Sequence, residues 1–187
     1  MNKIIGILGM QGAIAEHQEI LMQILHTKTR IVKTAKDLDC IDGLILPGGE
    51  STAIGKLLDY FSLKEILQQK IISGLPVFGT CAGLILLAKN IENQTNTHLA
   101  TMDITVKRNG YGSQLDSFST NLLIPTIDKN MPIPLVFIRA PYITKTGKDV
   151  QILATLDNKI IAARQKNMLV SSFHPELTND LRFHQYF

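Results

Sequence analysis

The chain has 187 residues, of which 45% are hydrophobic and 19% are charged, a composition typical of one compact globular domain. The net charge of +3 is a mild excess, the lysines are scattered and only 6% of residues are aromatic, which argues against nucleic-acid binding. No apolar run approaches the roughly 20 residues that a membrane span needs, and Cys40 and Cys81 are too few for a disulfide framework. We therefore expect one domain, residues 1–187, in the cytoplasm, with neither a membrane nor a nucleic acid as partner.

The first half of the chain alternates apolar strand-like runs with helix-like segments. We predict strands at 4–8, 29–33, 44–46 and 77–78, and helices at 13–26, 51–60, 63–72 and 84–89. Such alternation predicts a parallel sheet covered by helices on both faces. In sheets of this kind, ligands bind beyond the carboxyl ends of the strands.

The second half is instead rich in strands joined by turns. We predict strands at 100–107, 117–124, 135–139, 150–156, 159–163 and 168–173, and a last helix at 178–187 capped by Thr178. Asp157-Asn158 is a plausible two-residue hairpin turn, and Gln165-Lys166-Asn167 closes a second hairpin. The expected fold is therefore α/β, a single open and mostly parallel sheet with helices on both faces and an antiparallel extension.

The most informative segment is Gly79-Thr80-Cys81-Ala82-Gly83, which follows an apolar run and precedes a helix-like segment. A nucleophile on such a tight strand-to-helix turn forms a nucleophile elbow, here with cysteine in place of serine. The helix dipole would favour the thiolate at this position. A buried structural cysteine is an equally good interpretation of the pentapeptide alone.

A second segment is Phe173-His174-Pro175-Glu176. If it is extended, His174 and Glu176 point to the same side. A carboxylate beside an imidazole holds its tautomer and stabilises the imidazolium, as the base of a nucleophile requires.

A third segment is Leu46-Pro47-Gly48-Gly49, which reads as a buried strand ending in a tight turn, with Ser51 as a plausible helix cap. A Gly-Gly turn exposes backbone N–H groups of the kind an oxyanion hole needs. Each segment alone is weak, but the three in this order indicate an active site.

These residues resemble class I (triad) glutamine amidotransferases and, more narrowly, the glutaminase subunits of two-component pyridoxal 5′-phosphate synthases. The Cys and His-Pro-Glu motifs are shared by class I glutaminases generally. The narrower resemblance rests on Gln11-Gly12-Ala13 with Glu16-His17, Glu50-Ser51-Thr52, Arg108-Asn109 with Gly112 and Gln114, Phe137-Ile138-Arg139-Ala140-Pro141 and Leu177-Thr178.

The resemblance implies hydrolysis of L-glutamine to L-glutamate and ammonia by a triad of Cys81, His174 and Glu176 through a thioester. Backbone N–H groups near Gly49 and Ala82 would form the oxyanion hole. No metal and no cofactor is required by this chemistry.

The resemblance also assigns glutamine binding to a set of positions, namely Gly48, Gly49, Glu50, Arg108, Ile138 and Arg139. A guanidinium group matches a carboxylate bidentately, which favours Arg108 and Arg139 as ligands of the glutamine carboxylate. Both could also be ordinary surface residues. Glu50 could bind substrate or complement a helix N-terminus, and the sequence leaves both open.

The implied partner is a barrel-fold synthase subunit that takes the ammonia for pyridoxal 5′-phosphate (vitamin B6) synthesis in a large hetero-oligomer. The alternatives are a glutaminase of another pathway, a cysteine hydrolase or stress-response protein of the same sheet architecture with a different substrate, and a non-catalytic regulatory subunit of the synthase. Ser113 stands where the family usually has arginine, and the chain stops at Phe187, where the family's last helix often continues. His17 fits a family position, near the partner interface or simply exposed, whereas His184 is expected on the surface and Cys40 in a structural role.

Overall fold

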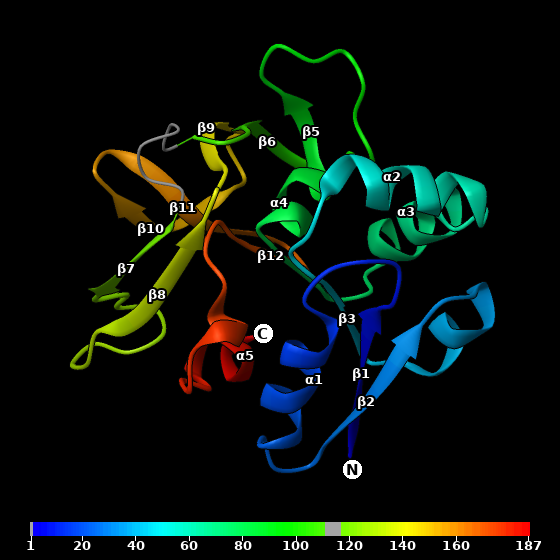
Figure 1. The fold of residues 1–187 in the computed structure, drawn as a ribbon, viewed down its shortest axis with the longest axis horizontal. Coiled ribbons are helices and arrows are strands. Elements are labelled where there is room, and N and C mark those ends of the chain that lie inside the picture. The colour runs from blue at the N-terminus through cyan, green and yellow to red at the C-terminus, as the bar shows by residue number, and fades with distance from the viewer. Residues whose placement is uncertain (1, 111–116) are drawn as a thin grey trace.

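A single ten-stranded sheet organises the chain in the computed structural model, which describes residues 2–110 and 117–187 (Figure 1). The strands are β1 (Lys3–Leu8), β2 (Thr27–Val32), β3 (Gly43–Leu46), β4 (Val77–Thr80), β5 (Ala88–Ile91), β6 (Met102–Lys107), β7 (Ser117–Leu122), β8 (Ile133–Ile138), β9 (Tyr142–Thr146), β10 (Gln151–Leu156), β11 (Lys159–Gln165) and β12 (Met168–Ser171). The helices are α1 (Ile14–Met22), α2 (Ser51–Tyr60), α3 (Lys64–Ile72), α4 (Ala82–Leu87) and α5 (Arg182–Tyr186), with 3₁₀ helices η1 (Ala35–Cys40) and η2 (Pro175–Leu177).

The order of strands in the sheet is β2-β1-β3-β4-β12-β11-β9-β6-β5, with β10 beside β11 and a separate β7-β8 hairpin. Neighbours from β2 to β12 run parallel, whereas β12-β11, β11-β9 and β9-β6 are antiparallel. The predicted fold class is confirmed. The last strand, β12, was expected in the antiparallel extension but pairs in parallel with β4, so it joins the extension to the parallel core.

Alternation along β3 explains why both faces of the sheet are covered. Leu44 and Leu46 enter one buried cluster, and Ile45 enters the other, because successive strand residues point to opposite faces. The first cluster collects apolar residues of α2, α3 and α4, and the second collects those of α1, α5 and the β7-β8 hairpin.

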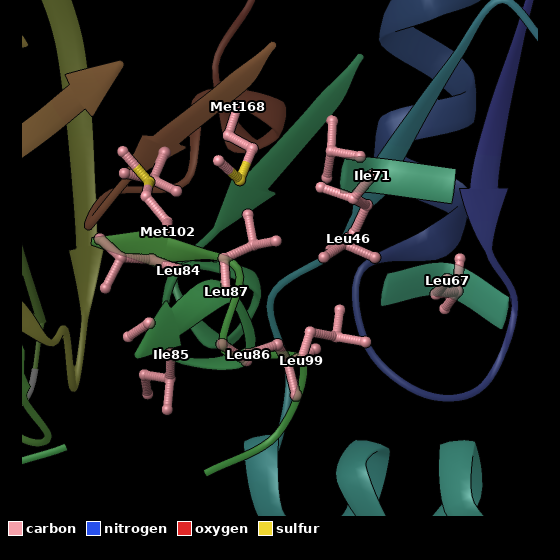
Figure 2. Close-up of a cluster of buried hydrophobic side chains, with 14 of the residues drawn as sticks. Leu46, Leu67, Ile71, Leu84, Ile85, Leu86, Leu87, Leu99, Met102 and Met168 are labelled. Atoms are coloured by element: carbon pink, nitrogen blue, oxygen red, sulfur yellow. The ribbon is translucent and has the colours of Figure 1, made fainter. Parts of the chain in front are cut away.

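Helix α4 is buried on every side. Figure 2 shows Leu84, Leu86 and Leu87 grouped with Met102 and Met168. A helix that is apolar all round belongs in the interior, and this packing holds in place the N-terminus of α4, where Cys81 lies.

Several predicted elements differ from the observed ones. The predicted helix 84–89 is wrong at both ends, because α4 begins at Ala82 and the chain becomes strand β5 at Ala88. The first and last helices are shorter than predicted. At the C-terminus the Thr178 hydroxyl accepts a hydrogen bond from the Asp180 N–H at 3.2 Å, forming a turn, so the helix begins only at Arg182. Strand β9 was not predicted.

In the part of the chain that the structure describes, no helix is both long enough and apolar enough to cross a membrane. The Ser113 position, singled out from the sequence, lies outside the described residues. Cys40 is exposed, so the expectation that it has a structural role is wrong.

Candidate active site

Cys81 lies between β4 and α4 in a strained turn, with φ +49° and ψ −98°. The glycines around it are required by close backbone approach. A Cβ on Gly83 would lie 2.1 Å from the Leu46 carbonyl oxygen, and one on Gly79 would lie 2.6 Å from the Gly83 backbone. A non-glycine residue at such a φ is uncommon and is concentrated at functional sites. The predicted strand-turn-helix geometry around Cys81 is present.

His174 and Glu176 form a buried pair, with 2.7 Å between Nδ1 and Oε1. The His174 N–H donates to the Val136 carbonyl at 2.8 Å, which anchors this segment to β8. The condition on which the sequence argument rested, an extended segment, is not met, because Pro175–Leu177 is a 3₁₀ turn. The two side chains therefore meet because the backbone turns between them.

The charges around His174 favour its protonated form. Burial by itself lowers the pKa of this imidazole, but side-chain hydrogen bonds to Cys81 and Glu176, together with their negative charge, raise it to about 10. Nδ1 faces Glu176, which leaves the other ring nitrogen for the Cys81 side chain. An imidazolium in this position stabilises an adjacent thiolate.

The Gly48-Gly49 turn lies against the same imidazole. A Cβ on Gly48 would lie 2.4 Å from His174 Cε1, and one on Gly49 would lie 2.5 Å from Gln11 Oε1. Gln11 Oε1 accepts from the Glu50 N–H at 2.8 Å. The turn is thus held between the loop before α1 and the imidazole of His174.

Glu50, not Ser51, caps α2. Its carboxylate accepts from the N–H groups of Thr52 and Ala53 at 3.2 and 2.7 Å, and Ser51 is already helical. The Arg108 guanidinium lies 3.0 Å from the Glu50 carboxylate and donates to the Thr52 hydroxyl at 3.2 Å. Burial raises the pKa of Glu50, but the hydrogen bonds from these N–H groups and the charge of Arg108 together outweigh it and lower the pKa overall. The structure therefore gives Glu50 the capping role that the sequence left open.

A cavity of about 350 Å³ opens over these residues. Its lining brings together most of the predicted site with residues that the sequence did not assign, and consists of Gln11, Gly49, Glu50, Ser51, Cys81, Ile85, Arg108, Asn109, Ile138, Arg139, Pro141 and His174. Three predicted site residues do not line the cavity themselves but are next to residues that do: Gly48 beside Gly49, Ala82 beside Cys81, and Glu176 beside His174. Arg139 has a φ of +42°, so it too is held in an uncommon conformation.

Two buried histidines lie behind the triad-like cluster and were misjudged from the sequence. His17 has no exposed surface and His184 is 4% exposed, so the expectation of surface positions is wrong. His17 Nδ1 lies 2.9 Å from His184 Nε2, and His17 Nε2 lies 3.5 Å from Glu176 Oε2. For His17 the available signal was its helical spacing to Leu21, which places it on the buried stripe of α1.

The fold is that of glutamine amidotransferases. A crystal structure of a glutamine amidotransferase superposes with a TM-score of 0.91 at 38% identity, over 97% of this chain and 95% of that one. The PurLQS structure from Thermotoga maritima, at 14% identity, shares the fold with a TM-score of 0.73 over 100% of this chain and 97% of that one.

Sequence comparison identifies one family within the glutamine amidotransferases. A model of the SNO glutamine amidotransferase family matches residues 7–187. The pyridoxal 5′-phosphate synthase subunit PdxT of Carboxydothermus hydrogenoformans is 56% identical over 98% of this chain and 95% of its own length. PdxT of Haemophilus influenzae is 55% identical over 98% and 95%. The chain belongs to the SNO glutamine amidotransferase family, which confirms the resemblance inferred from its motifs.

Proposed function

We propose that this protein hydrolyses L-glutamine to L-glutamate and ammonia with Cys81, His174 and Glu176 as its catalytic triad. The observation that carries the proposal is the placement of His174 between the Cys81 thiol and the Glu176 carboxylate at the edge of a cavity. A cavity of about 350 Å³ is at the lower end of ligand sites, which suits a small metabolite.

The chemistry follows from the charge state of the pair. The Cys81 thiolate attacks the side-chain amide carbon of glutamine, and the carbonyl electrons move to its oxygen. As the tetrahedral intermediate collapses, the His174 imidazolium gives its proton to the leaving nitrogen, and ammonia departs. Neutral His174 then takes a proton from water, whose oxygen attacks the γ-glutamyl thioester. Glutamate leaves, and the thiolate and imidazolium are restored.

Backbone N–H groups supply the oxyanion hole in this proposal. Ala82 is the first residue of α4, where N–H groups have no partner within the helix. Gly49 lies across the cavity in the turn held by Gln11. Preorganised donors of this kind contribute about 3–4 kcal/mol each to the transition state in known hydrolases.

Glutamine recognition must read an α-carboxylate and an α-amino group. Arg108 and Arg139 line the cavity and offer guanidinium groups for the carboxylate. The backbone of the Gly48-Gly49-Glu50 turn and of Ile138 would complete the binding site.

The ammonia is passed, we propose, to a pyridoxal 5′-phosphate synthase subunit of barrel fold within a large hetero-oligomer. Relatives named PdxT, at 55–56% identity over nearly the whole chain, support this partner. Residues 1–187 would act as one domain in the cytoplasm.

The test is to measure glutamate and ammonia release with and without an added synthase subunit, for wild type and Cys81→Ala. Turnover that needs Cys81 and rises with the synthase supports the whole proposal. Turnover that needs Cys81 but ignores that synthase reassigns the pathway. Absence of turnover in both conditions contradicts the glutaminase.

A further inference from the structure

The carboxylate of Glu176 faces two imidazoles, one on each oxygen. Oε1 lies 2.7 Å from His174 Nδ1, and Oε2 lies 3.5 Å from Nε2 of the fully buried His17. Oε2 accepts no hydrogen bond among the described residues. A buried carboxylate oxygen needs donors to keep its negative charge, so the His17 N–H is placed where that charge requires support.

His17 also contacts the residue that precedes the nucleophile. Its Nε2 lies 3.2 Å from the Thr80 hydroxyl, and Thr80 is the last residue of β4 before Cys81. His17 thereby connects α1, the end of β4 and Glu176. A displacement of the His17 ring would therefore disturb both Glu176 and, through Thr80, Cys81.

The hydrogen bond between His17 and His184 of α5 determines the tautomer of His17. His184 Nδ1 is buried and has no hydrogen-bond partner within residues 2–110 and 117–187, whereas its Nε2 lies 2.9 Å from His17 Nδ1. A bare lone pair is less costly to bury than an orphaned N–H, so the favoured tautomer of His184 carries its hydrogen on Nε2 and donates to His17. That leaves His17 with its hydrogen on Nε2, directed at Glu176 and Thr80.

Both histidines are kept neutral. Burial, followed by the neighbouring His184 and His174, lowers the pKa of His17, and burial lowers the pKa of His184 to about 4. Other ionisable groups near this network include Cys81 beside His174, Glu16 and Glu19 of α1, which line a depression with Glu176, and Lys3 and Asp42, which line a cavity with His184.

We propose that His17 is a positioning residue for the Cys81–His174–Glu176 triad, with its Nε2–H bonded to Thr80 and facing Glu176 Oε2 at 3.5 Å, and held in that tautomer by His184. The inference rests on the proposed glutaminase and explains why two imidazoles occupy the core where apolar residues would pack without a polar cost. By supporting the negative charge of Glu176, His17 strengthens the His174 imidazolium and therefore the Cys81 thiolate.

The test compares His17→Gln with His17→Met in the full-length protein. The two side chains have similar shape and length, but only glutamine carries an N–H donor near the position of Nε2. We expect His17→Met to lower kcat for glutamine, measured with the synthase present, by about 10- to 100-fold. KM should stay within about twofold, because His17 does not line the cavity. His17→Gln should keep most of the activity.

A second readout is independent of glutamine. In a Cys40→Ser background, which removes the exposed thiol, the rate of Cys81 alkylation by iodoacetamide against pH reports the thiolate directly. His17→Met should move the midpoint upward by about half to one pH unit, the effect expected when a buried carboxylate loses a nearby N–H dipole, and His17→Gln should move it little.

The outcomes separate the two claims. If wild type hydrolyses no glutamine but the alkylation midpoint moves in His17→Met alone, the glutaminase fails and the positioning role stands. A folded His17→Met that matches wild type in both readouts overturns the positioning role, as does an equal loss in both variants. If His17→Met does not fold, His184→Met and His184→Gln provide the same comparison. We then expect the alkylation midpoint to move in His184→Met alone, by less than in His17→Met. Equal midpoints in the two His184 variants would overturn the positioning role.

Discussion

The imidazole of His174 lies directly on the backbone of Gly48, so closely that a methyl group there would fall 2.4 Å from Cε1 and 2.9 Å from Nδ1. Real Cβ atoms do not approach other atoms so closely, and Gly48 therefore defines one wall of the space that His174 occupies. The same ring is also held by Glu176, whose Oε1 lies 2.7 Å from Nδ1.

Gly48→Ala is expected to inactivate the enzyme while leaving the fold intact. The added methyl group must displace the His174 ring from its position beside Cys81 and Glu176, and a displacement of about 1 Å at a reacting group costs about 100-fold in rate. Glutamine turnover and circular dichroism measure the two effects. Gly43→Ala, at the start of β3, meets only side-chain ends, Phe187 Cζ at 3.0 Å and Ile5 Cδ1 at 3.3 Å, and is the matched control. Turnover above about one tenth of wild type in Gly48→Ala would show that the ring tolerates displacement.

The raised pKa of His174 predicts how the contribution of Glu176 to stability depends on pH. The folded-state pKa, about 10, lies above the ordinary value of 6.5, so the stabilisation is complete below about 6.5 and is lost as the pH rises toward 10. Thermal unfolding of wild type and Glu176→Gln between pH 6 and 10 tests this dependence. The gap in Tm should be largest at pH 6 and shrink steadily toward pH 10, and a gap that is constant or grows with pH would contradict the ion pair.

Arg108 is expected to act on substrate binding rather than on chemistry. Its guanidinium lines the cavity beside the cap of α2, and its loss removes a partner for the α-carboxylate. Arg108→Met should raise KM by about tenfold or more with a smaller change in kcat, because an ionic hydrogen bond of about 1.5–3 kcal/mol is lost.

The control for Arg108 is Glu50→Gln, which removes the ion pair but keeps the arginine. Since Glu50 caps α2 through two backbone N–H groups, this variant should lose about 1 kcal/mol of stability with little change in KM. Equal effects of the two substitutions on KM would mean that Arg108 serves only its ion pair with Glu50.

Much of this site could be predicted because its residues are adjacent in sequence or follow a rule of the fold. Cys81 follows a buried strand and Gly48-Gly49 follows another, and parallel strands place their carboxyl ends at one edge. The pairing of His174 with Glu176 was predicted on the condition of an extended segment, whereas in the structure His174 stands just before the 3₁₀ turn that carries Glu176.

The predictions that were wrong concern contacts between segments that are distant in sequence. The parallel pairing of β12 with β4 joins residues about 90 positions apart, and no local pattern distinguishes it from another hairpin strand. His17 and His184 are 167 residues apart, and their burial follows from the meeting of α1 with α5 behind Glu176. A histidine has the same local pattern whether it faces water or a buried carboxylate, so only the tertiary structure decides its role.

The strain at Cys81 predicts a conflict between stability and activity. With φ at +49° and ψ at −98°, any residue with a Cβ is held in a sparsely populated region, at a cost of about 1–3 kcal/mol, which glycine avoids. Cys81→Gly and Cys81→Ala both remove the thiol and should both abolish turnover. Only glycine relieves the backbone, so Cys81→Gly should unfold about 2–4 °C above Cys81→Ala, the shift expected for about 1 kcal/mol in a chain of this size. Equal melting temperatures would place the strain elsewhere in the elbow, whereas the expected difference would show that the fold holds its nucleophile in a conformation that only the surrounding packing of α4 and β4 sustains.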